Sequence, residues 1–318
     1  MMLKNNFLLL FGIVATMLIH VTWKWGLDYL TLDILANNIG RCGLFIFVLE
    51  MGRMCRESKD KLFLLKKISI IYLLCFVTYN TVLILTKESS IISYFRIFGK
   101  FILGVDGNIW IIHGLLVFLA IVFFCDRITY QSRIKLLFIG AGYSTLALTV
   151  FVYANVYKNI WMFDNNIIFK LFKNILGSNR PSVVLAVPFL YLGYISKNIK
   201  INRTLLKYVC IITNIVWIAE ITLLQQLYSM NNVYMTIIGA IGILSLYLLI
   251  KTDDYNYPEF EIALIIFGLQ YTIHTFVIWA FDLSFVGEYL LWFCVYTAVI
   301  VPIYYFVSMI IKRQIDHN

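Results

Sequence analysis

Ionisable side chains that interrupt long apolar runs are the residues of this sequence best suited to chemistry. His20, Arg41, Glu220 and His274 each stand inside such a run, and Arg180 stands at the start of another. A charged group within a membrane-length apolar segment is costly, so it normally faces a partner or a polar cavity. These residues are therefore the first candidates for a functional site.

Two kinds of chemistry follow from these residue types. An imidazole, with a pKa of about 6.5, takes a proton from a hydroxyl or returns one to a leaving group, so His20 and His274 are acid/base candidates. Arginine supplies a fixed charge and a fork of donors for a carboxylate, a phosphate or a developing oxyanion, which suits Arg41 and Arg180. The sequence contains no GxSxG, GxxxxGK[ST], HExxH or GxGxxG motif, and no metal site is expected.

The segments that must position these residues are apolar and long. Of 318 residues, 61% are hydrophobic and 14% are charged, which excludes an ordinary soluble domain. Blocks of about 17 to 25 apolar residues cross a hydrocarbon core as helices, whereas open strands would leave backbone groups unpaired in lipid. We predict one all-α domain over residues 1–318, a polytopic integral membrane bundle of about ten transmembrane helices. The expected spans are roughly 6–23, 31–51, 67–86, 107–125, 134–155, 181–196, 206–227, 233–250, 260–280 and 286–311.

Basic residues in the connections predict the orientation of this bundle. Ten spans put both termini on one side, and 17 of the 26 lysines and arginines fall on that side, against eight on the other. Cytoplasmic loops carry the excess of Lys and Arg, so both termini are expected in the cytoplasm. The Ile, Asn and Lys usage is typical of an AT-rich bacterial genome, which indicates a multi-pass protein of a bacterial plasma membrane. The net charge of +9 is then a topology signal, and nucleic-acid binding is not expected.

The candidate polar residues share one depth in this topology. His20, Arg41, Glu220 and His274 fall in the outer halves of their spans, Arg180 opens the sixth span on the outside, and Asn108 and Trp110 begin the fourth; Glu50 alone lies near an inner end. A polar cavity open toward the outer side would produce this pattern. Structural alternatives exist for each residue: His20 and Arg41 can snorkel to headgroups, Glu220 can pair with an arginine, and His274 can be a packing histidine.

Short patterns also recur in order along the chain. His20 follows Asn6 and Leu9 in the first span, and the second span contains Arg41, Phe45, Phe47, Val48, Met51 and Gly52. The fourth span begins Asn108-Ile109-Trp110-Ile111-Ile112-His113-Gly114-Leu115. Arg180 precedes Pro188-Phe189 and Leu192-Gly193-Tyr194 in the sixth, and the ninth contains Tyr271-Thr272-Ile273-His274.

This ordered set resembles the membrane-bound acyltransferase type 3 family, which includes polysaccharide O-acetyltransferases and the membrane part of vancomycin-resistance serine racemases. The family patterns read approximately D-x-x-R followed by His, R-x-x-x-P-x-F-F-x-x-S-G, H-L-W-F-L, R-N-G-L-F-x-G-x-P-F-F-x-L-G-Y, and Y-x-x-H. Asn6 and Leu9 replace the Asp and Arg of the first pattern, Phe45 and Met51 replace the Pro and Ser of the second, and Asn108 replaces the His that opens the third.

The resemblance implies a ten-helix bundle that moves an acyl group, usually acetyl from acetyl-CoA, to a hydroxyl of an envelope polysaccharide or a lipid-linked sugar. Carried onto this chain, it makes His20 the catalytic base. Arg41 and Arg180 become groups of the central cavity, and His274 a further polar participant. Glu220, Asn108 and Trp110 complete the predicted substrate-binding set by their depth. A route from the basic cytoplasmic loops is also expected, because an anionic acyl-CoA must be attracted and its thioester must reach the histidine.

Two other functions remain open. Intramembrane arginine and glutamate also suit a transporter or binding domain for a small zwitterion or sugar. The replacement of the family's Asp and Arg by Asn6 and Leu9 also fits a family member that has lost catalysis and is kept for binding or assembly. Only the acyltransferase predicts acetylated surface glycan that depends on this chain.

Overall fold

The structure of the protein is a computed structural model, which describes residues 3–22, 30–86, 109–125, 140, 186–199, 201–228, 236–251, 257–282 and 286–316. Over these residues the regular structure is helical and contains no strand, so the predicted all-α class is confirmed for them. The α-helices are α1 (Leu3–Thr22), α2 (Leu30–Glu57), α3 (Lys61–Leu85), α5 (Ile109–Cys125), α9 (Val187–Ile195), α10 (Arg203–Tyr228), α11 (Ile237–Ile250), α12 (Tyr257–Phe281) and α13 (Val286–Asp316). A 3-10 turn, η4 (Ser196–Asn198), extends α9.

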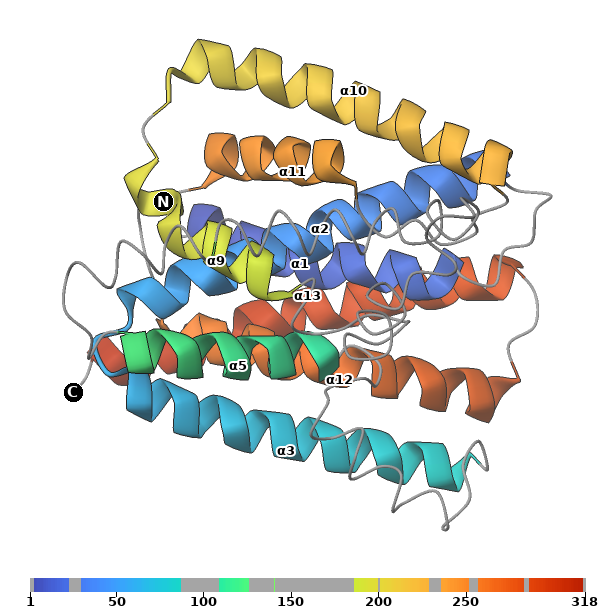
Figure 1. Ribbon diagram of the computed structural model, residues 1–318. Helices are drawn as coiled ribbons and strands as arrows, with labels where there is room; N and C mark the ends of the chain where they lie inside the picture. The colour runs from blue at the N-terminus through green and yellow to red at the C-terminus, as the bar shows by residue number, and fades with distance from the viewer. Residues whose placement is uncertain are drawn as a thin grey trace, which may run out of the picture.

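The helices run back and forth along a common direction, and both chain termini lie at the same end of the bundle (Figure 1). At that end α2 gives way to α3, α9 to α10, and α11 to α12. We call it the basic end, because the helix ends and connections there carry Arg53, Arg56, Lys61, Lys197, Arg203 and Lys251. The grouping of the termini with these basic residues agrees with the topology expected from the sequence.

Side-chain caps fix where individual helices begin at the two ends. Asp60 caps α3 by accepting a hydrogen bond from the Phe63 amide at 2.9 Å. Thr236 caps α11 by accepting one from the Gly239 amide at 3.0 Å. Such caps satisfy amide groups that the first helical turn leaves without partners. The helices themselves need no further signal, since a continuous apolar run in lipid must satisfy its backbone internally.

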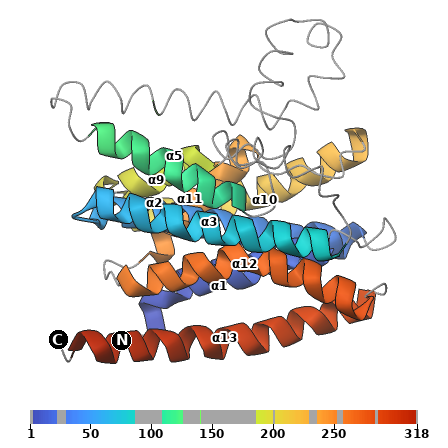
Figure 2. The ribbon, with the colours of Figure 1, turned by 90° about the horizontal axis from the view of Figure 1, so that it is seen from below.

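Helix α2 lies at the centre and α1 packs along it. A Cβ added at Gly43 would lie 2.3 Å from the Ala15 Cβ, and one at Gly12 would lie 2.5 Å from the Phe47 Cβ, so small residues let the two backbones approach closely. On other sides α2 contacts α9 and α11, while α12 contacts α1, α3 and α13. Figure 2 shows α13 at one outer edge of the bundle, next to α12.

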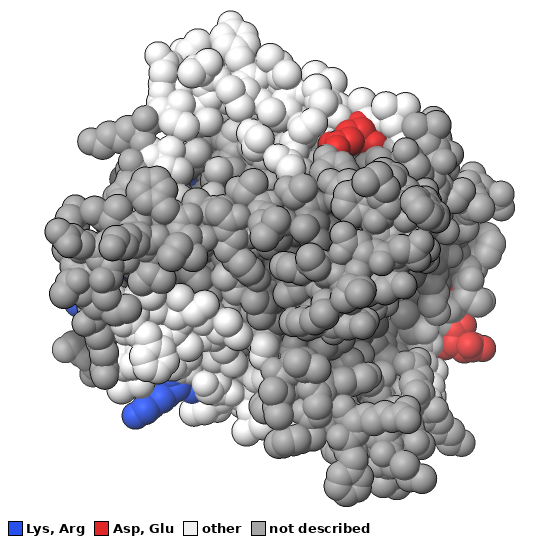
Figure 3. All heavy atoms as spheres, in the orientation of Figure 1, with Lys and Arg blue, Asp and Glu red and all other residues white. Residues whose placement is uncertain are grey.

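Much of the described surface is apolar. Leu74 on α3, and Ile212 and Ile215 on α10, are each about 60% exposed, as expected for helices that face lipid. Figure 3 shows a face on which the described atoms are largely uncharged, with basic side chains toward the basic end and acidic ones toward the other. Among the described residues, four helices are long and apolar enough to cross a membrane, and α1, α5 and α11 contain shorter apolar segments.

Most of the predicted spans coincide with helices of the structure. Nine of the ten contain a described helix; the span at 134–155 lies outside the described residues except for Gly140, and so do residues 181–185 of the sixth. The count of ten spans therefore stays a prediction. Helix α2 runs on to Glu57 and α3 begins at Lys61, beyond the predicted 51 and 67, because polar residues extend both helices past their apolar blocks.

Candidate functional site

Two of the predicted site residues are buried charged or ionisable groups in the half of the bundle away from the basic end. Arg41 on α2 is 3% exposed and His274 on α12 is 5% exposed. Trp110, at the start of α5, is also buried, and Glu220 on α10 is half-buried. Arg41 and Glu220 both have interaction partners in the structure. The sequence thus located groups that the fold removes from solvent.

His274 is oriented by α13. Its Nδ1 accepts a hydrogen bond from the Trp292 indole at 3.2 Å, and one helical turn earlier Gln270 accepts one from the Tyr296 hydroxyl at 3.3 Å. An indole N–H can only donate, so the Nδ1 atom of His274 carries no proton in this arrangement. The neutral imidazole then holds its proton on Nε2. The contact between α12 and α13 therefore selects one tautomer of a buried histidine.

Two further buried polar side chains near these residues were not identified from the sequence. Asn38 is 6% exposed and stands one turn before Arg41; Thr272 is 4% exposed and stands two residues before His274. Within the described part of the chain, both amide atoms of Asn38 and the hydroxyl of Thr272 have no hydrogen-bond partner. Buried polar groups normally form hydrogen bonds with protein, water or ligand. This half of the bundle therefore contains donors and acceptors that could bind a water molecule or a ligand. Their place beside Arg41 and His274 was the available signal.

The other predicted site residues lie outside the described part. The His20 backbone belongs to α1, which ends away from the basic end, but its side chain is not described, and Arg180 and Asn108 fall outside the described ranges. A common pocket of His20, Arg41, Arg180 and His274 therefore stays a prediction. The described helices do not bring Glu220 and His274 together, because α10 packs on α11 while α12 packs on α1, α3 and α13.

The most completely built polar cluster joins α2 to α11 and centres on Glu50, which is 1% exposed. Arg53, one turn later on α2, donates from Nε to the two Glu50 oxygens at 3.2 and 3.1 Å and from Nη2 in a short ion pair. The Tyr247 hydroxyl on α11 donates to Oε2 at 2.7 Å. The carboxylate and the guanidinium thus offset each other's charge in an apolar setting, which ties two helices together.

Cations surround this cluster and bind the end of α9. Arg56 Nη1 donates to the Tyr194 carbonyl at 3.1 Å and lies over the Tyr194 ring, and Lys251 Nζ donates to the Ser196 carbonyl at 2.7 Å. Lys197 pairs with Glu57 at 2.9 Å. Cationic side chains at the C-terminal carbonyls of a helix satisfy orphan acceptors and complement its dipole.

The sequence revealed this cluster only in part. Glu50 was recognised as the intramembrane acid near an inner end, and its spacing to Arg53 is that of a helical ion pair. Tyr247 carried no signal, because it stands 197 residues away from Glu50 in the sequence. Among the described residues, both oxygens of Glu50 receive donors, and these bonds join α2 to α11.

No described group of three or more His, Cys, Asp or Glu side chains could hold a metal ion. The cysteines Cys42, Cys55, Cys75, Cys125, Cys210 and Cys294 are free and distributed over five helices. Cys55 and Cys75 are buried in the apolar core, and Cys210 is buried next to Asn214, whose Nδ2 donates to its sulfur at 3.6 Å.

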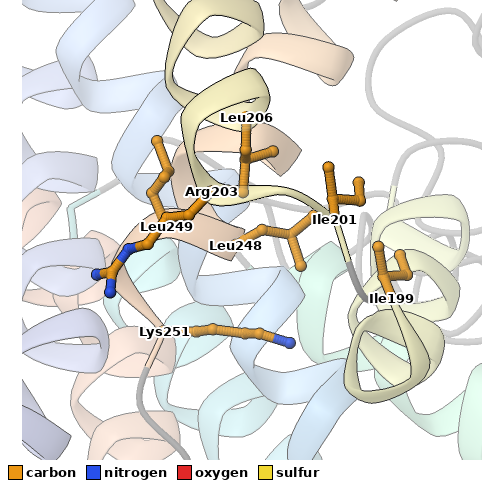
Figure 4. A pocket seen from close by; sticks show the side chains of 7 residues that line it. All are labelled: Ile199, Ile201, Arg203, Leu206, Leu248, Leu249 and Lys251. Carbon is orange, nitrogen blue, oxygen red and sulfur yellow. The ribbon is translucent and has the colours of Figure 1, made fainter.

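A pocket of about 270 Å³ opens at the basic end between the start of α10 and the end of α11. It is lined by Ile199, Ile201, Arg203, Leu206, Leu248, Leu249 and Lys251 (Figure 4). None of the residues predicted for catalysis or substrate binding lines it.

Fold and composition together define a helical membrane protein, with several helices apolar and long enough to span a bilayer. Comparison with protein-family models, curated proteins and solved structures gave no match to this chain.

Proposed function

We propose that the chain is an integral membrane O-acyltransferase of the bacterial envelope, which moves acetyl from acetyl-CoA to a hydroxyl of a polysaccharide or lipid-linked sugar. One observation carries the proposal: the stretches that resemble the acyltransferase patterns interlock at the centre of the bundle. The pattern glycine of α2, Gly52, meets the backbone of Leu190, and that of α9, Gly193, meets the backbone of Leu49. Cβ atoms at these glycines would lie 2.0 and 1.9 Å from the facing carbonyl oxygens.

Aromatic residues of the same two stretches complete this contact, although Phe45 stands where the α2 pattern has Pro. The rings of Phe45 and Phe189 are 4.2 Å apart between centroids, a close tilted pair. Arg56, just after the α2 pattern, donates to the carbonyl of Tyr194, the last residue of the α9 pattern. Residues that match by sequence order therefore also match by contact, which a chance similarity of apolar stretches does not require.

The remaining pattern-bearing helices adjoin this centre. On α5, which begins with the Trp110 stretch, Phe118 contacts the Tyr194 ring at 5.8 Å between centroids. On α12, which carries His274, Phe267 stacks on Phe47 at 4.4 Å. Helix α1, which carries His20, packs along α2. The five helices α1, α2, α5, α9 and α12 thus form one connected unit, while α10 packs against α11 outside it.

The proposed reaction gives each group a defined task. His20 takes the proton of the acceptor hydroxyl as the oxygen attacks the thioester carbonyl; the C–O bond forms, the C–S bond breaks, and the proton passes to the departing thiolate. Arg41 and Arg180 stabilise the oxyanion of the tetrahedral intermediate with fixed charge. His274, Asn108 and Trp110 contact the acceptor; Glu220 is left out of this set, because the described helices do not bring it to His274. Asn38 and Thr272 supply buried hydrogen-bonding groups of the kind that hold a sugar hydroxyl.

Acetylation of surface glycan tests the proposal. Cells that express the chain should carry acetylated glycan, and His20→Ala should lower the acetylation rate by about 10² to 10⁴ because the general base is lost. Arg41→Lys should also impair transfer, since a point charge does not reproduce a planar fork. His113→Ala is the matched control, because His113 on α5 contacts the Tyr72 ring away from α1 and should leave acetylation unchanged. Full acetylation with His20→Ala would remove the catalytic assignment.

A binding or transport domain for a small zwitterion or sugar is the second candidate. It is supported by the buried Arg41 and by the Asn38 amide beside it, which has no hydrogen-bond partner among the described residues. It predicts no acetyl group that depends on the chain. Ligand affinity, measured on the purified protein, should instead change in both His20→Ala and Arg41→Lys.

A further inference from the structure

We propose that the pocket between α10 and α11 at the basic end binds the phosphate headgroup of an anionic membrane phospholipid. None of the residues predicted for acyl transfer lines the pocket, and neither does Glu50, Arg53 or Tyr247. The proposal therefore does not depend on the proposed acyl-transfer reaction. It follows from the chemistry of the lining, from the position of the pocket and from its size.

The lining is that of a site for an amphiphile. Five of its seven lining residues are aliphatic, namely Ile199, Ile201, Leu206, Leu248 and Leu249, although the surface open to the pocket is more polar than apolar. The two cationic residues, Arg203 and Lys251, come from the ends of two different helices (Figure 4). A small soluble anion would have to give up hydration against the aliphatic part and gain nothing from it. A phospholipid uses both parts, because its phosphate meets the cations and its glycerol and first methylenes meet the isoleucines and leucines.

The position of the pocket suits a lipid of the bilayer. Helix α10 lies at the outside of the bundle (Figure 1). Several residues that follow Arg203 on it expose apolar side chains. Leu205, Ile211 and Ile212 are each more than 55% exposed. Acyl chains can lie along this surface while the headgroup stays at the basic end. Basic pockets between helices on the cytoplasmic side are where anionic headgroups bind membrane proteins.

The size of the pocket favours a headgroup over a nucleotide. Its 270 Å³ fall below the roughly 300 to 1,000 Å³ of pockets that enclose a drug-sized ligand. The adenine, ribose and phosphates of a coenzyme A molecule form a larger group than that. A phosphodiester with part of its glycerol, which leaves its chains outside, fits the available space.

Local contacts hold the Lys251 side chain and the backbone turn of Arg203 in place. Lys251 is fixed at the pocket by its bond to the Ser196 carbonyl at 2.7 Å. Asn202 caps α10 through Oδ1, which accepts from the Thr204 amide at 2.8 Å and so fixes the turn that carries Arg203. Arg203 itself is exposed, and its guanidinium can turn toward a phosphate and bind it with two parallel donors.

The test uses the full chain in nanodiscs of phosphatidylcholine, titrated with labelled phosphatidylglycerol. The variants are Arg203→Gln and Arg203→Gln with Lys251→Gln. Lys207→Gln is the matched control. Lys207 is also exposed and lies one turn after Arg203 on α10, but it does not line the pocket. We expect apparent affinity to fall about 5-fold in the single variant and about 30-fold in the double variant, from the usual contribution of one basic residue near an anionic surface.

Three outcomes would overturn the proposal. The first is unchanged affinity in Arg203→Gln, which keeps the Lys251 contact and should fold normally. The second is an equal loss in Lys207→Gln, which would indicate general attraction to the surface rather than a site. The third is displacement of the labelled lipid by inorganic phosphate or coenzyme A at millimolar concentration, which would assign the pocket to a soluble phosphate instead.

Discussion

The Glu50 carboxylate accepts hydrogen bonds from residues on two helices. Because the carboxylate is buried, the loss of either bond should lower the stability of the protein. Arg53 supplies the opposite charge from the same helix, and Tyr247 supplies a neutral hydroxyl from α11. In a medium of low polarity, an ion pair that loses one partner leaves the other charge without compensation. The two partners of Glu50 should therefore differ in how much they matter.

Glu50→Gln should destabilise the protein by about 3 to 5 kcal/mol, because it leaves the buried Arg53 charge without its carboxylate. Tyr247→Phe should cost about 1.5 to 3 kcal/mol, the usual value for a hydrogen bond to a charged group. The measurement is thermal unfolding of the purified protein in detergent.

Tyr296→Phe is the matched control for the tyrosine variant. Tyr296 is also buried, but its hydroxyl donates to a neutral acceptor, Gln270 Oε1, at 3.3 Å. Its loss should cost only about 0.5 to 1.5 kcal/mol. If Tyr247→Phe proves as mild as Tyr296→Phe, the carboxylate does not depend on its contact with α11.

Residue types in a sequence reveal which groups are costly to bury but not what each will contact. The sequence identified Arg41 and His274 because an ionisable residue inside an apolar run is costly and normally faces a partner or a cavity. Both side chains are buried in the structure. Trp292 and Tyr247, the partners of His274 and Glu50, are common in membrane helices and gave no such signal. Asn38 was overlooked because an amide carries no charge, although burial makes an unpartnered amide expensive as well.

At the scale of helices, the contact between α2 and α9 depends on two glycines from distant parts of the sequence. Each removes a side chain where the other helix places a backbone carbonyl, and backbone atoms cannot turn aside as a side-chain end can. In lipid, where burial of apolar surface gives little drive, such close approach supplies much of the attraction between helices.

Gly52→Ala should therefore separate α2 from α9. Its Cβ would lie 2.0 Å from the Leu190 oxygen, and we expect a loss of about 3 kcal/mol or more, at the upper end for overpacked cores, seen as a low yield of monodisperse protein and a lower unfolding temperature. Gly242→Ala serves as the control, because its Cβ would meet only the Asn214 side chain at 3.2 Å. Equal tolerance of both changes would contradict the tight crossing.

Helix existence was predictable and helix partners were not. Nine predicted spans contain a described helix, because a continuous apolar run in lipid favours a helix. Among the described residues, four of these helices are long and apolar enough to cross a bilayer. Boundaries failed where polar residues continue a helix beyond its apolar block, as in α2 up to Glu57. Which helices meet follows from shape, and Gly52 and Gly193 signal a close contact without naming the helix that makes it.

Across the whole molecule, charge is distributed along the bundle axis. The termini and the basic connections share one end (Figure 1). The buried Arg41, in the first half of α2, and the buried His274, in the second half of α12, lie toward the other end, and the flanks are apolar. In the proposed acyl transfer, a cytoplasmic donor and an external acceptor would meet the bundle at opposite ends, which this distribution allows. The proposed lipid pocket occupies the basic end, where anionic headgroups are expected.

The orientation of this axis is open to a direct measurement. A reporter fused after Asn318 should behave as cytoplasmic, because the excess of Lys and Arg stays on the cytoplasmic side during insertion. One inserted at Asn231 should behave as external, since α10 ends and α11 begins at the end opposite the termini. An insertion after Ser58, between α2 and α3, is the internal control and must match the Asn318 fusion. Reversed signals at all three positions would mean that the bundle has the opposite orientation, with the basic end outside and the half that contains Arg41 and His274 toward the cytoplasm. A mismatch between the Ser58 and Asn318 reporters would instead show that the chain crosses the membrane an odd number of times between these two residues.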